Sequence, residues 1–423
     1  MEKNKKNVPK IRFKGFTEKW EEKEFSNTFL FLNNNTLSRA ELNYESGSTK
    51  NVHYGDVLIK FGECLDISKE ELPYITNEKI ANKYAHLQDG DIIIADAAED
   101  ETVGKCTELL NVNEQVVAGL HTIACRPLLS FANRYLGYLL NASVFHNQLL
   151  PLMQGTKIVG ISKSAIKDTL IYYPEFNEQT QIGNYFQNID KLIEAKQSRI
   201  DKLKNIKKAC LEKMFPKKGA TTPEIRFKGF IGEWVLRQLD TMTSYSNGRG
   251  HEEKQSNQGK YELINLNSIS IDGGLKPSGK FINEASDTLL KNDLVMVLSD
   301  VGHGDLLGRV AIIPENDRFV LNQRVALLRL NETILSEFLF FCINAQQSYF
   351  KLQGVGSSQL NISKESVETF SSCIPCLKEQ EQIGTFFKKL DNLISQNEQQ
   401  LTTLKNIKKA CLEKMFVNKE DAL

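Results

Sequence analysis

The string LKNIKKACLEKMF occurs twice in this chain, at Leu203–Phe215 and again at Leu404–Phe416. Upstream of both copies the likeness continues to Glu178 and Glu379, so that 22 of 38 compared positions are identical. A match of this length, at a separation of 201 residues, indicates an internal duplication. The chain is therefore predicted to consist of two halves that end in the same way.

A second repeat lies at the front of each half. The sequence IRFKGF stands at Ile11–Phe16 before Trp20 and again at Ile225–Phe230 before Trp234, and these are the only two tryptophans. The bodies that follow, of 157 and 144 residues, differ in length and share few anchor positions. Constant ends around divergent bodies indicate shared docking parts around two separately specialised units.

The repeated back segments are predicted to be helices that pack on each other. Their apolar residues are spaced by 3, 4, 7 and 3, as in the a/d seam of a coiled coil. The seam residues are Phe186, Ile189, Ile193, Ile200 and Leu203, matched by Phe387, Leu390, Ile394, Leu401 and Leu404. Lys196 and Asn397 occupy the skipped seam position, where a polar residue either fixes the register or marks a solvated seam end.

The bodies between these repeats are predicted to be mixed α and β. Short β-rich runs are Asp91–Ala95, Thr122–Arg126, Thr169–Tyr173, Asp293–Leu298, Arg309–Ile313 and Arg324–Arg329. Helical stretches are expected near Asn133–Leu152 and Ile334–Leu352, and the breaker-rich Pro216–Pro223 ends the first long helix. The predicted boundaries are a first domain at 1–177, a helical spacer at 178–215, a linker at 216–222, a second domain at 223–378, a distal helical spacer at 379–416 and a tail at 417–423.

Composition is typical of a folded protein. Of 423 residues, 41% are hydrophobic and 25% charged, and 53 basic residues balance 53 acidic ones, so no whole-chain field favours nucleic acid or membrane. No apolar run long enough for a membrane span occurs, and a cytoplasmic location is expected. Among eight cysteines only Cys373 and Cys376 have metal-like spacing, and structural thiols are the favoured interpretation.

The ends of the two bodies share a further pattern of glycine, Ile-Ser, proline and Glu-Gln. In the first half it is Gly155, Ile161, Ser162, Lys163, Pro174, Glu178 and Gln179, and in the second Gly354, Ile362, Ser363, Lys364, Pro375, Glu379 and Gln380. Together with the front motif, this doubled arrangement resembles the specificity subunit of type I restriction-modification systems over essentially the whole chain. The front segments differ from each other only at Thr17–Lys19 and Ile231–Glu233.

The resemblance implies an α+β fold with two target-recognition domains, an antiparallel coiled coil of two long helices and a pseudo-twofold internal repeat. It also implies that each domain reads one half of a bipartite site in double-stranded DNA. The implied partners are two modification (methyltransferase) subunits and two restriction (motor-nuclease) subunits. A helix of 38 residues would be about 57 Å long, more than one turn of B-DNA at about 34 Å, so it could separate two readers.

The sequence lacks the motifs of the enzyme classes that act on DNA. The ten prolines are never adjacent, which excludes the Asn/Asp-Pro-Pro-aromatic loop of adenine methyltransferases, and no phosphate-binding G-x-x-x-x-G-K-[ST] occurs. Gly302–Gly304 is predicted to be a turn, and the nuclease-like set of Asp240, Glu252 and Lys254 lies in a loop-like setting. No histidine, His121 and His303 included, has a partner at diagnostic spacing. We therefore predict a non-catalytic chain with no metal and no cofactor.

Two other function classes stay open. One is a methyltransferase or nuclease fused to its own reader, which binding of S-adenosylmethionine by the isolated chain would favour. The other is a coiled-coil adaptor without DNA affinity, which failure to retard any duplex would favour.

Candidate DNA contacts lie in the loops that precede Ile161 and Ile362, because these loops combine flexible backbone with hydrogen-bonding side chains. The candidates are Thr156 and Lys157 after Gly155, and Ser357, Ser358 and Gln359. Glutamine pairs bidentately with adenine, whereas lysine contacts guanine or phosphate. The alternative is a plain surface turn.

Candidate partner-docking residues are the lysines of the repeated helices. They are Lys204, Lys207, Lys208, Lys405, Lys408 and Lys409. Because the repeat is identical even at positions predicted to be exposed, one surface could serve two copies of one partner. A solvated charged face, or recent gene conversion, would explain the same identity.

Overall fold

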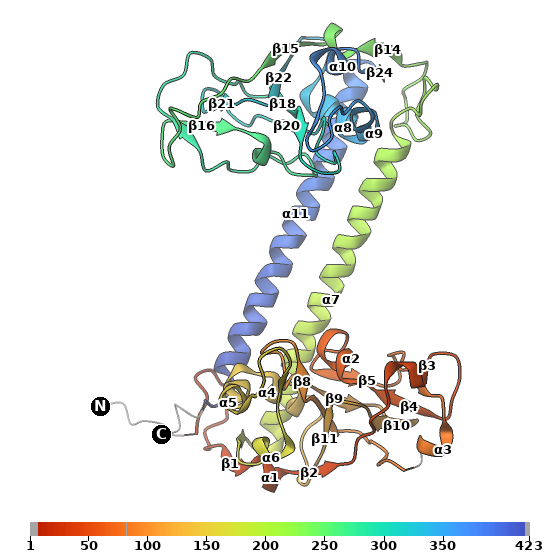
Figure 1. The fold of residues 1–423 in the computed structure, drawn as a ribbon, viewed down its shortest axis with the longest axis vertical. Helices are drawn as coiled ribbons and strands as arrows, with labels where there is room; N and C mark the ends of the chain where they lie inside the picture. The colour runs from red at the N-terminus through yellow and green to blue at the C-terminus, as the bar shows by residue number, and fades with distance from the viewer. Residues whose placement is uncertain (1–6, 82, 419–423) are drawn as a thin grey trace. The chain divides into compact units, whose positions relative to one another are not determined.

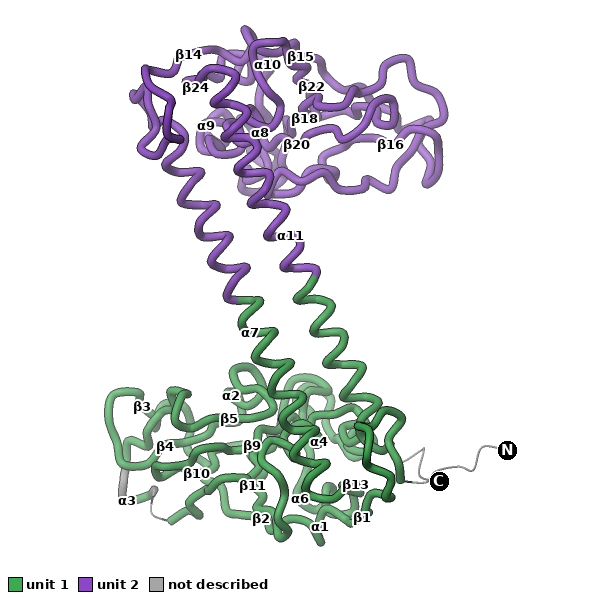
Figure 2. The backbone as a smooth tube through the Cα atoms, turned by 180° about the vertical axis from the view of Figure 1, so that it is seen from behind, with its two compact units in different colours: residues 1–197, 400–423 green, residues 198–399 purple. Residues whose placement is uncertain are grey.

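The computed structural model describes residues 7–81 and 83–418. Contacts divide the chain into two compact units, residues 1–197 with 400–423 and residues 198–399 (Figure 2). This division cuts both long helices, so the end of the second helix belongs to the first unit. The domain boundaries predicted at the helix ends stay a prediction.

The two long helices are α7 (Phe176–Lys213) and α11 (Leu377–Lys414), each of 38 residues (Figure 1). Both lie two residues earlier than the repeated segments predicted, because Met214 and Phe215, with Met415 and Phe416, leave the helix and become buried. All the predicted seam residues are buried or half-buried, which confirms the seam.

Within the first unit, segments of the two helices pack antiparallel. Lys196 Nζ donates to Gln400 Oε1 at 2.8 Å, and Tyr185 Oη lies 3.4 Å from Cys411 Sγ. From the first of these contacts to the second, the residue number falls along α7 and rises along α11. The two segments therefore run antiparallel.

The second unit repeats this packing with the other ends of the same helices. Lys204 pairs with Glu398 at 2.7 Å, and Lys207 pairs with Asp391 at 2.6 Å. At the skipped seam position, Asn397 is buried and donates to the Leu393 carbonyl of its own helix turn at 2.6 Å. The predicted antiparallel pairing is thus confirmed for the helix segments inside each unit.

The body of the first unit contains two sheets and two short strand pairs. The larger sheet has the order β2 (Phe29–Leu32), β11 (Thr122–Pro127), β7 (Ile92–Ala95), β9 (Cys106–Leu110), β5 (Cys64–Asp66). The second sheet is β10 (Gln115–Ala118), β4 (Thr49–Val52), β6 (Tyr74–Ile75), β3 (Leu42–Asn43), and the pairs are β1 (Glu21–Glu24) with β13 (Leu170–Tyr173) and β12 (Val159–Gly160) with β8 (Ala97–Ala98). The short helices are α1 (Phe25–Thr28), α2 (Tyr54–Ile59), α3 (Glu78–Ala81), α4 (Tyr135–Asn141), α5 (Ser143–Leu149) and α6 (Lys163–Ile166), with 3-10 turns η1 (Arg39–Glu41) and η2 (Leu150–Leu152).

The body of the second unit follows the same plan with fewer strands. Its four-stranded sheet has the order β15 (Thr243–Asn247), β22 (Val325–Leu330), β18 (Leu294–Val297), β20 (Val310–Ile312). Its three-stranded sheet has the order β17 (Phe281–Ile282), β16 (Tyr261–Ile264), β21 (Phe319–Leu321). Its strand pairs are β14 (Val235–Gln238) with β24 (Ser371–Ile374) and β19 (Ser299–Asp300) with β23 (Leu360–Asn361). Its helices are α8 (Ser336–Ala345), α9 (Gln347–Leu352) and α10 (Lys364–Glu368), with η3 (Leu239–Thr241) and η4 (Leu266–Ser268).

The predicted α+β class is confirmed. Every predicted β-rich run contains a strand, and both predicted helical stretches contain two helices. The central strands β7 and β18 are buried along their whole length, which explains their continuous apolar sequences.

The front motif fastens each body to the long helices. Arg12 donates from Nε and Nη2 to both carboxylate oxygens of Glu178, at 2.7 and 2.6 Å, and Arg226 does the same to Glu379, at 2.7 and 2.8 Å. Both glutamate side chains are 1% exposed. A bidentate guanidinium satisfies a buried carboxylate, so the arginine of the motif and the glutamate of the helix occur together in each half.

The same motif also caps the opposite helix end. The amide of Ile11 donates to the Lys414 carbonyl, and the amide of Ile225 donates to the Lys213 carbonyl, both at 2.9 Å. Carbonyls in the last turn of a helix lack a partner within the helix, and these bonds supply one. Each unit therefore joins the end of one long helix to the start of the other through its front motif.

The other shared motif residues are also structural. Ile161 and Ile362 are buried, and the serines after them cap α6 and α10 by accepting backbone amide hydrogen bonds. The glutamine Gln179 is buried and bridges the Ala132 amide and the Pro174 carbonyl. Anchors of this kind explain why the two halves agree at their ends.

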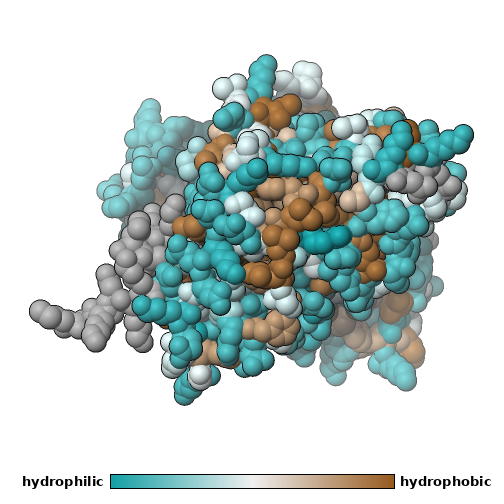
Figure 3. All heavy atoms as spheres, turned by 90° about the horizontal axis from the view of Figure 1, so that it is seen from below, coloured by the Kyte–Doolittle hydropathy of each residue, from teal (hydrophilic) through white to brown (hydrophobic). Residues whose placement is uncertain are grey.

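Figure 3 looks onto one face of the molecule, where a patch of apolar side chains is surrounded by hydrophilic ones. Among the described helices, none is both long and apolar enough to cross a membrane.

Glu108 on β9 is a buried carboxyl group at the start of α4. Its Oε1 accepts from the Arg134 amide at 2.6 Å and its Oε2 from the Gly137 amide at 2.8 Å. Burial raises the pKa of Glu108 to about 7, although these hydrogen bonds oppose the shift.

The stability of the first unit should therefore fall as pH rises from about 4.5 to about 7, because the folded state holds the proton more tightly than the unfolded chain. Over this pH range wild type should lose about 1–3 kcal/mol of unfolding free energy that the Glu108→Gln variant keeps. Urea unfolding of both proteins, followed by Trp20 fluorescence in a Trp234→Phe background, measures the difference. Parallel pH profiles for the two proteins would contradict the assignment.

Candidate functional site

In the first unit, loops at the ends of several strands are held together by backbone hydrogen bonds. The Gly119 amide after β10 donates to the Val52 carbonyl at the end of β4, at 2.9 Å. The Asn35 amide beyond β2 donates to the Ala118 carbonyl at 2.8 Å. The carboxyl ends of three strands thus meet at one place.

The same network includes the end of β7 and the loop that contains the predicted DNA contacts. The Asp96 amide donates to the His121 carbonyl at 3.0 Å, and the Ile161 amide donates to the Asp96 carbonyl at 2.9 Å. We call these loops the strand-end edge of the first unit: residues 33–35, 53–55, 96–104, 119–121 and 154–160.

Three of these four bonds recur in the second unit. The Asn322 amide donates to the Ile264 carbonyl, the Leu298 amide to the Arg324 carbonyl, and the Ile362 amide to the Leu298 carbonyl, each at 2.9 Å. The strand-end edge of the second unit comprises residues 248–252, 265–268, 298–307, 322–324 and 355–361.

Side chains at matched positions of the two edges differ in chemistry. His53 after β4 corresponds to Asn265 after β16, and each accepts a hydrogen bond from the amide two residues later. Asp96 corresponds to Leu298. A constant backbone with different side chains at matched positions is suited to reading different ligands of one class.

The predicted DNA-contact loops are hairpins on these edges, closed by bridges between Gln154 and Gly160 and between Val355 and Asn361. Gly155 has φ +114° and Gly356 has φ +137°, and a Cβ on either would clash with a carbonyl oxygen of the hairpin. The sequence alignment of Gly155 with Gly354 was therefore wrong, since Gly356 is the counterpart.

The predicted contacts in these hairpins differ in accessibility. Thr156, Lys157, Ser357 and Ser358 are exposed. Gln359 is half-buried, and its Nε2 donates to Ser299 Oγ at 2.6 Å. Reading adenine with this amide would require that bond to break, so Gln359 is a weaker candidate than its exposed neighbours.

The candidate docking lysines also fall into two groups. Lys408 is 16% exposed and bridges Glu63 and Asp190 at 2.6 and 2.7 Å, while Lys207 is 20% exposed and pairs with Asp391. Burial lowers the pKa of Lys408, but the two carboxylates raise it by a larger amount, so the net shift is upward. These two lysines stabilise the helix packing.

The other four lysines are accessible. Lys208, Lys405 and Lys409 are exposed, and Lys204 is exposed while pairing with Glu398. Their role in docking stays a prediction.

Spacing in the sequence could not indicate the surroundings of the histidines in the first strand-end edge, because their neighbours are distant in sequence. Nδ1 of His121 lies 3.2 Å from Asp96 Oδ1, and the His121 ring meets Tyr54 edge-on at 5.2 Å. His53 lies 4.7 Å from the Tyr54 ring, centroid to centroid. Burial lowers the pKa of His53 and raises the pKa of Asp96.

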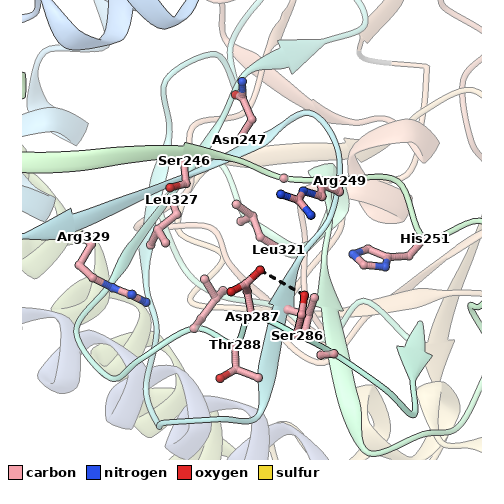
Figure 4. A pocket seen from close by; sticks show the side chains of 14 residues that line it. Ser246, Asn247, Arg249, His251, Ser286, Asp287, Thr288, Leu321, Leu327 and Arg329 are labelled. Carbon is pink, nitrogen blue, oxygen red and sulfur yellow. Dashed lines mark hydrogen bonds between the residues drawn. The ribbon is translucent and has the colours of Figure 1, made fainter.

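A polar pocket of about 410 Å³ lies beside the second strand-end edge (Figure 4). In this view Arg249 and His251 lie on one side and Arg329 on the other. Asp287 accepts a hydrogen bond from Ser286 at 3.2 Å. Arg329 is held by Asp293 through two bonds of 3.0 and 2.7 Å, so the Arg249 guanidinium is the better placed of the two arginines to meet an anionic ligand.

Within residues 7–81 and 83–418, no group of three or more histidine, cysteine, aspartate or glutamate side chains could hold a metal ion. Cys373 is buried and Cys376 exposed, and both are free thiols. Gly302 and Gly304 have φ +116° and +75°, consistent with the predicted turn.

Comparison with known proteins places these features in a family. Residues 6–205 and 231–406 match the family described as type I restriction modification DNA specificity domain. The MjaVIII type I restriction enzyme specificity subunit of Methanocaldococcus jannaschii is 23% identical over 282 residues, covering 63% of this chain and 65% of that protein. The putative MjaX specificity subunit of the same organism is 22% identical, covering 98% of this chain and 96% of that protein.

Solved structures share the fold. The type I restriction-modification S subunit from M. genitalium has a TM-score of 0.59 at 15% identity, covering 97% of this chain and 99% of that one. A second solved chain has a TM-score of 0.56 at 14% identity, covering 96% of this chain and 98% of that one. Its structure is described as the structural basis of complex assembly and conformational transition of the type I R-M system. With two family domains spanning most of its length, this chain belongs to the type I restriction-modification DNA specificity family.

Proposed function

We propose that this chain selects the DNA target of a type I restriction-modification complex and contributes no catalytic residue of its own. Each strand-end edge reads one part of a bipartite site in double-stranded DNA. The observation that carries this proposal is the repeated backbone network, which holds different side chains at matched positions of the two units.

The partners in this proposal are two modification subunits and two restriction subunits, and the complex acts in the cytoplasm. The duplicated helical string supports paired docking, since it offers the exposed Lys208 and Lys409 in identical local sequence. The exposed hairpin residues Thr156, Lys157, Ser357 and Ser358 are the proposed DNA contacts on the two edges.

The test is a map of methylated adenines in a host without its own adenine methylation. Cells that express this chain with its modification partner should carry methylation at one bipartite motif. Cells that express the chain alone should carry none, because neither a methyltransferase loop nor a phosphate-binding loop occurs in the sequence. Methylation by the chain alone, or methylation without a motif, would contradict the proposal.

A further inference from the structure

Two turns at matched positions of the strand-end edges have an unusual backbone conformation. The turn between β10 and β11 ends at His121 with φ +52°, and the turn between β21 and β22 ends at Arg324 with φ +65°. The left-handed region is accessible to glycine, and asparagine, aspartate and histidine enter it more readily than other residues. Arginine has no such preference, so its presence at Arg324 costs stability.

A backbone hydrogen bond accounts for the left-handed conformation at this position. It does not account for the side chains that occur there. In both units the carbonyl of this residue accepts the amide that follows the central strand, from Asp96 to His121 and from Leu298 to Arg324. Glycine would form the same bond without strain. A histidine and an arginine at one matched left-handed position, where glycine would suffice, therefore indicate that the side chains themselves are used.

Their surroundings leave both side chains accessible. The His121 side chain is 50% exposed and is oriented by Asp96 and the edge of Tyr54. Arg324 is exposed, and within the described part of the chain its guanidinium forms no hydrogen bond or ion pair. The left-handed Arg134 differs, because its amide donates to Glu108 at the start of α4.

The chemistry of the two side chains fits base edges in a DNA groove. A guanidinium donates two parallel hydrogen bonds to O6 and N7 of guanine, which lysine or a neutral side chain cannot match in geometry. An imidazole can donate one hydrogen bond to a base acceptor. Resting on the proposed function, we propose that Arg324 and His121 are matched specificity-determining residues, Arg324 reading a guanine for the second unit and His121 a base acceptor for the first.

The experiment uses the complex of the full chain with its modification partner. Methylation maps of cells with wild type first define the motif, and a duplex with that motif is then the binding probe. Arg324→Ala should relax one base pair in one half of the motif, with a loss of discrimination of about 5- to 150-fold. His121→Ala should relax one base pair in the other half only.

A glycine variant separates this role from a structural one. Arg324→Gly keeps the left-handed backbone and removes strain, so it should raise the melting temperature by about 2–4 °C while it loses the same discrimination. Asn292→Gly is the matched control, since Asn292 has φ +72° but lies outside the strand-end edge. It should leave the motif unchanged.

The outcomes distinguish the two proposals. If the wild-type complex methylates no motif, the proposed function fails. If wild type has a motif that Arg324→Ala and His121→Ala leave unchanged, the specificity assignment is overturned. It is also overturned if both variants weaken binding to all sequences alike, because loss of a phosphate contact has that effect.

Discussion

Replacing Arg12 with methionine should destabilise the first unit by about 3–5 kcal/mol, because it leaves the Glu178 carboxylate buried without its partner. Methionine fills similar space, so the loss of the charge pair dominates the change. Arg226→Met should have the same effect on the second unit through Glu379. The two tryptophans allow separate readouts, since Trp20 belongs to the first unit and Trp234 to the second. Urea unfolding in Trp234→Phe and Trp20→Phe backgrounds would follow each unit.

Two further variants control for this interpretation. The double substitution Arg12→Met with Glu178→Met should recover most of the lost stability, because no buried charge then remains unpaired. Arg318→Met removes an ion pair with Glu315 in which both side chains are about half exposed, and it should change stability little. If Arg12→Met resembles Arg318→Met, the front motif does not hold the helix in the way described.

Shortening both long helices by seven residues should shorten the unread gap of the DNA motif by about three base pairs. The paired deletion removes Lys196–Lys202 from α7 and Asn397–Thr403 from α11. It shortens each helix by about 10.5 Å, close to three base pairs at about 3.4 Å each. Because Leu203 and Leu404 then take the seam positions of Lys196 and Asn397, the heptad spacing is kept.

The measurement is again the methylated motif in cells that also express the modification partner. Both half-site sequences should persist while the gap changes, since the deletion leaves the strand-end edges intact. Deleting Lys196–Lys202 alone is the control, and it should lower stability because α11 then keeps a longer seam than α7. A paired deletion with the original gap would show that helix length does not set the spacing.

The long helices could be predicted because their signal is local and repeated. A seam spacing sustained over 38 residues determines a helix whatever surrounds it, and β-rich runs such as Asp91–Ala95 coincide with strands that are buried throughout. The helix ends were off by two residues because tertiary contacts terminate them. Phe215 and Phe416 leave their helices to pack against Phe387 and Phe186.

Much of the candidate site could not be predicted, because it is assembled from distant segments. His121 was dismissed for lack of a partner, yet Asp96 lies beside it through the pairing of β11 with β7. Lys408 was grouped with exposed lysines, whereas its side chain is largely buried and pairs with Glu63 and Asp190. Register and sheet order bring such residues together, and neither is readable from composition or spacing.

The sequence by itself determined the duplication, the α+β class, the paired helices and the family resemblance, because repeats and periodicity are properties of a linear string. Only the tertiary structure decided that Arg12 reaches Glu178, that Gly356 rather than Gly354 matches Gly155, and that His121 and Arg324 share one strained turn position. The reason is physical: backbone conformation and long-range pairing depend on which strands become neighbours. Packing of the whole unit makes that choice.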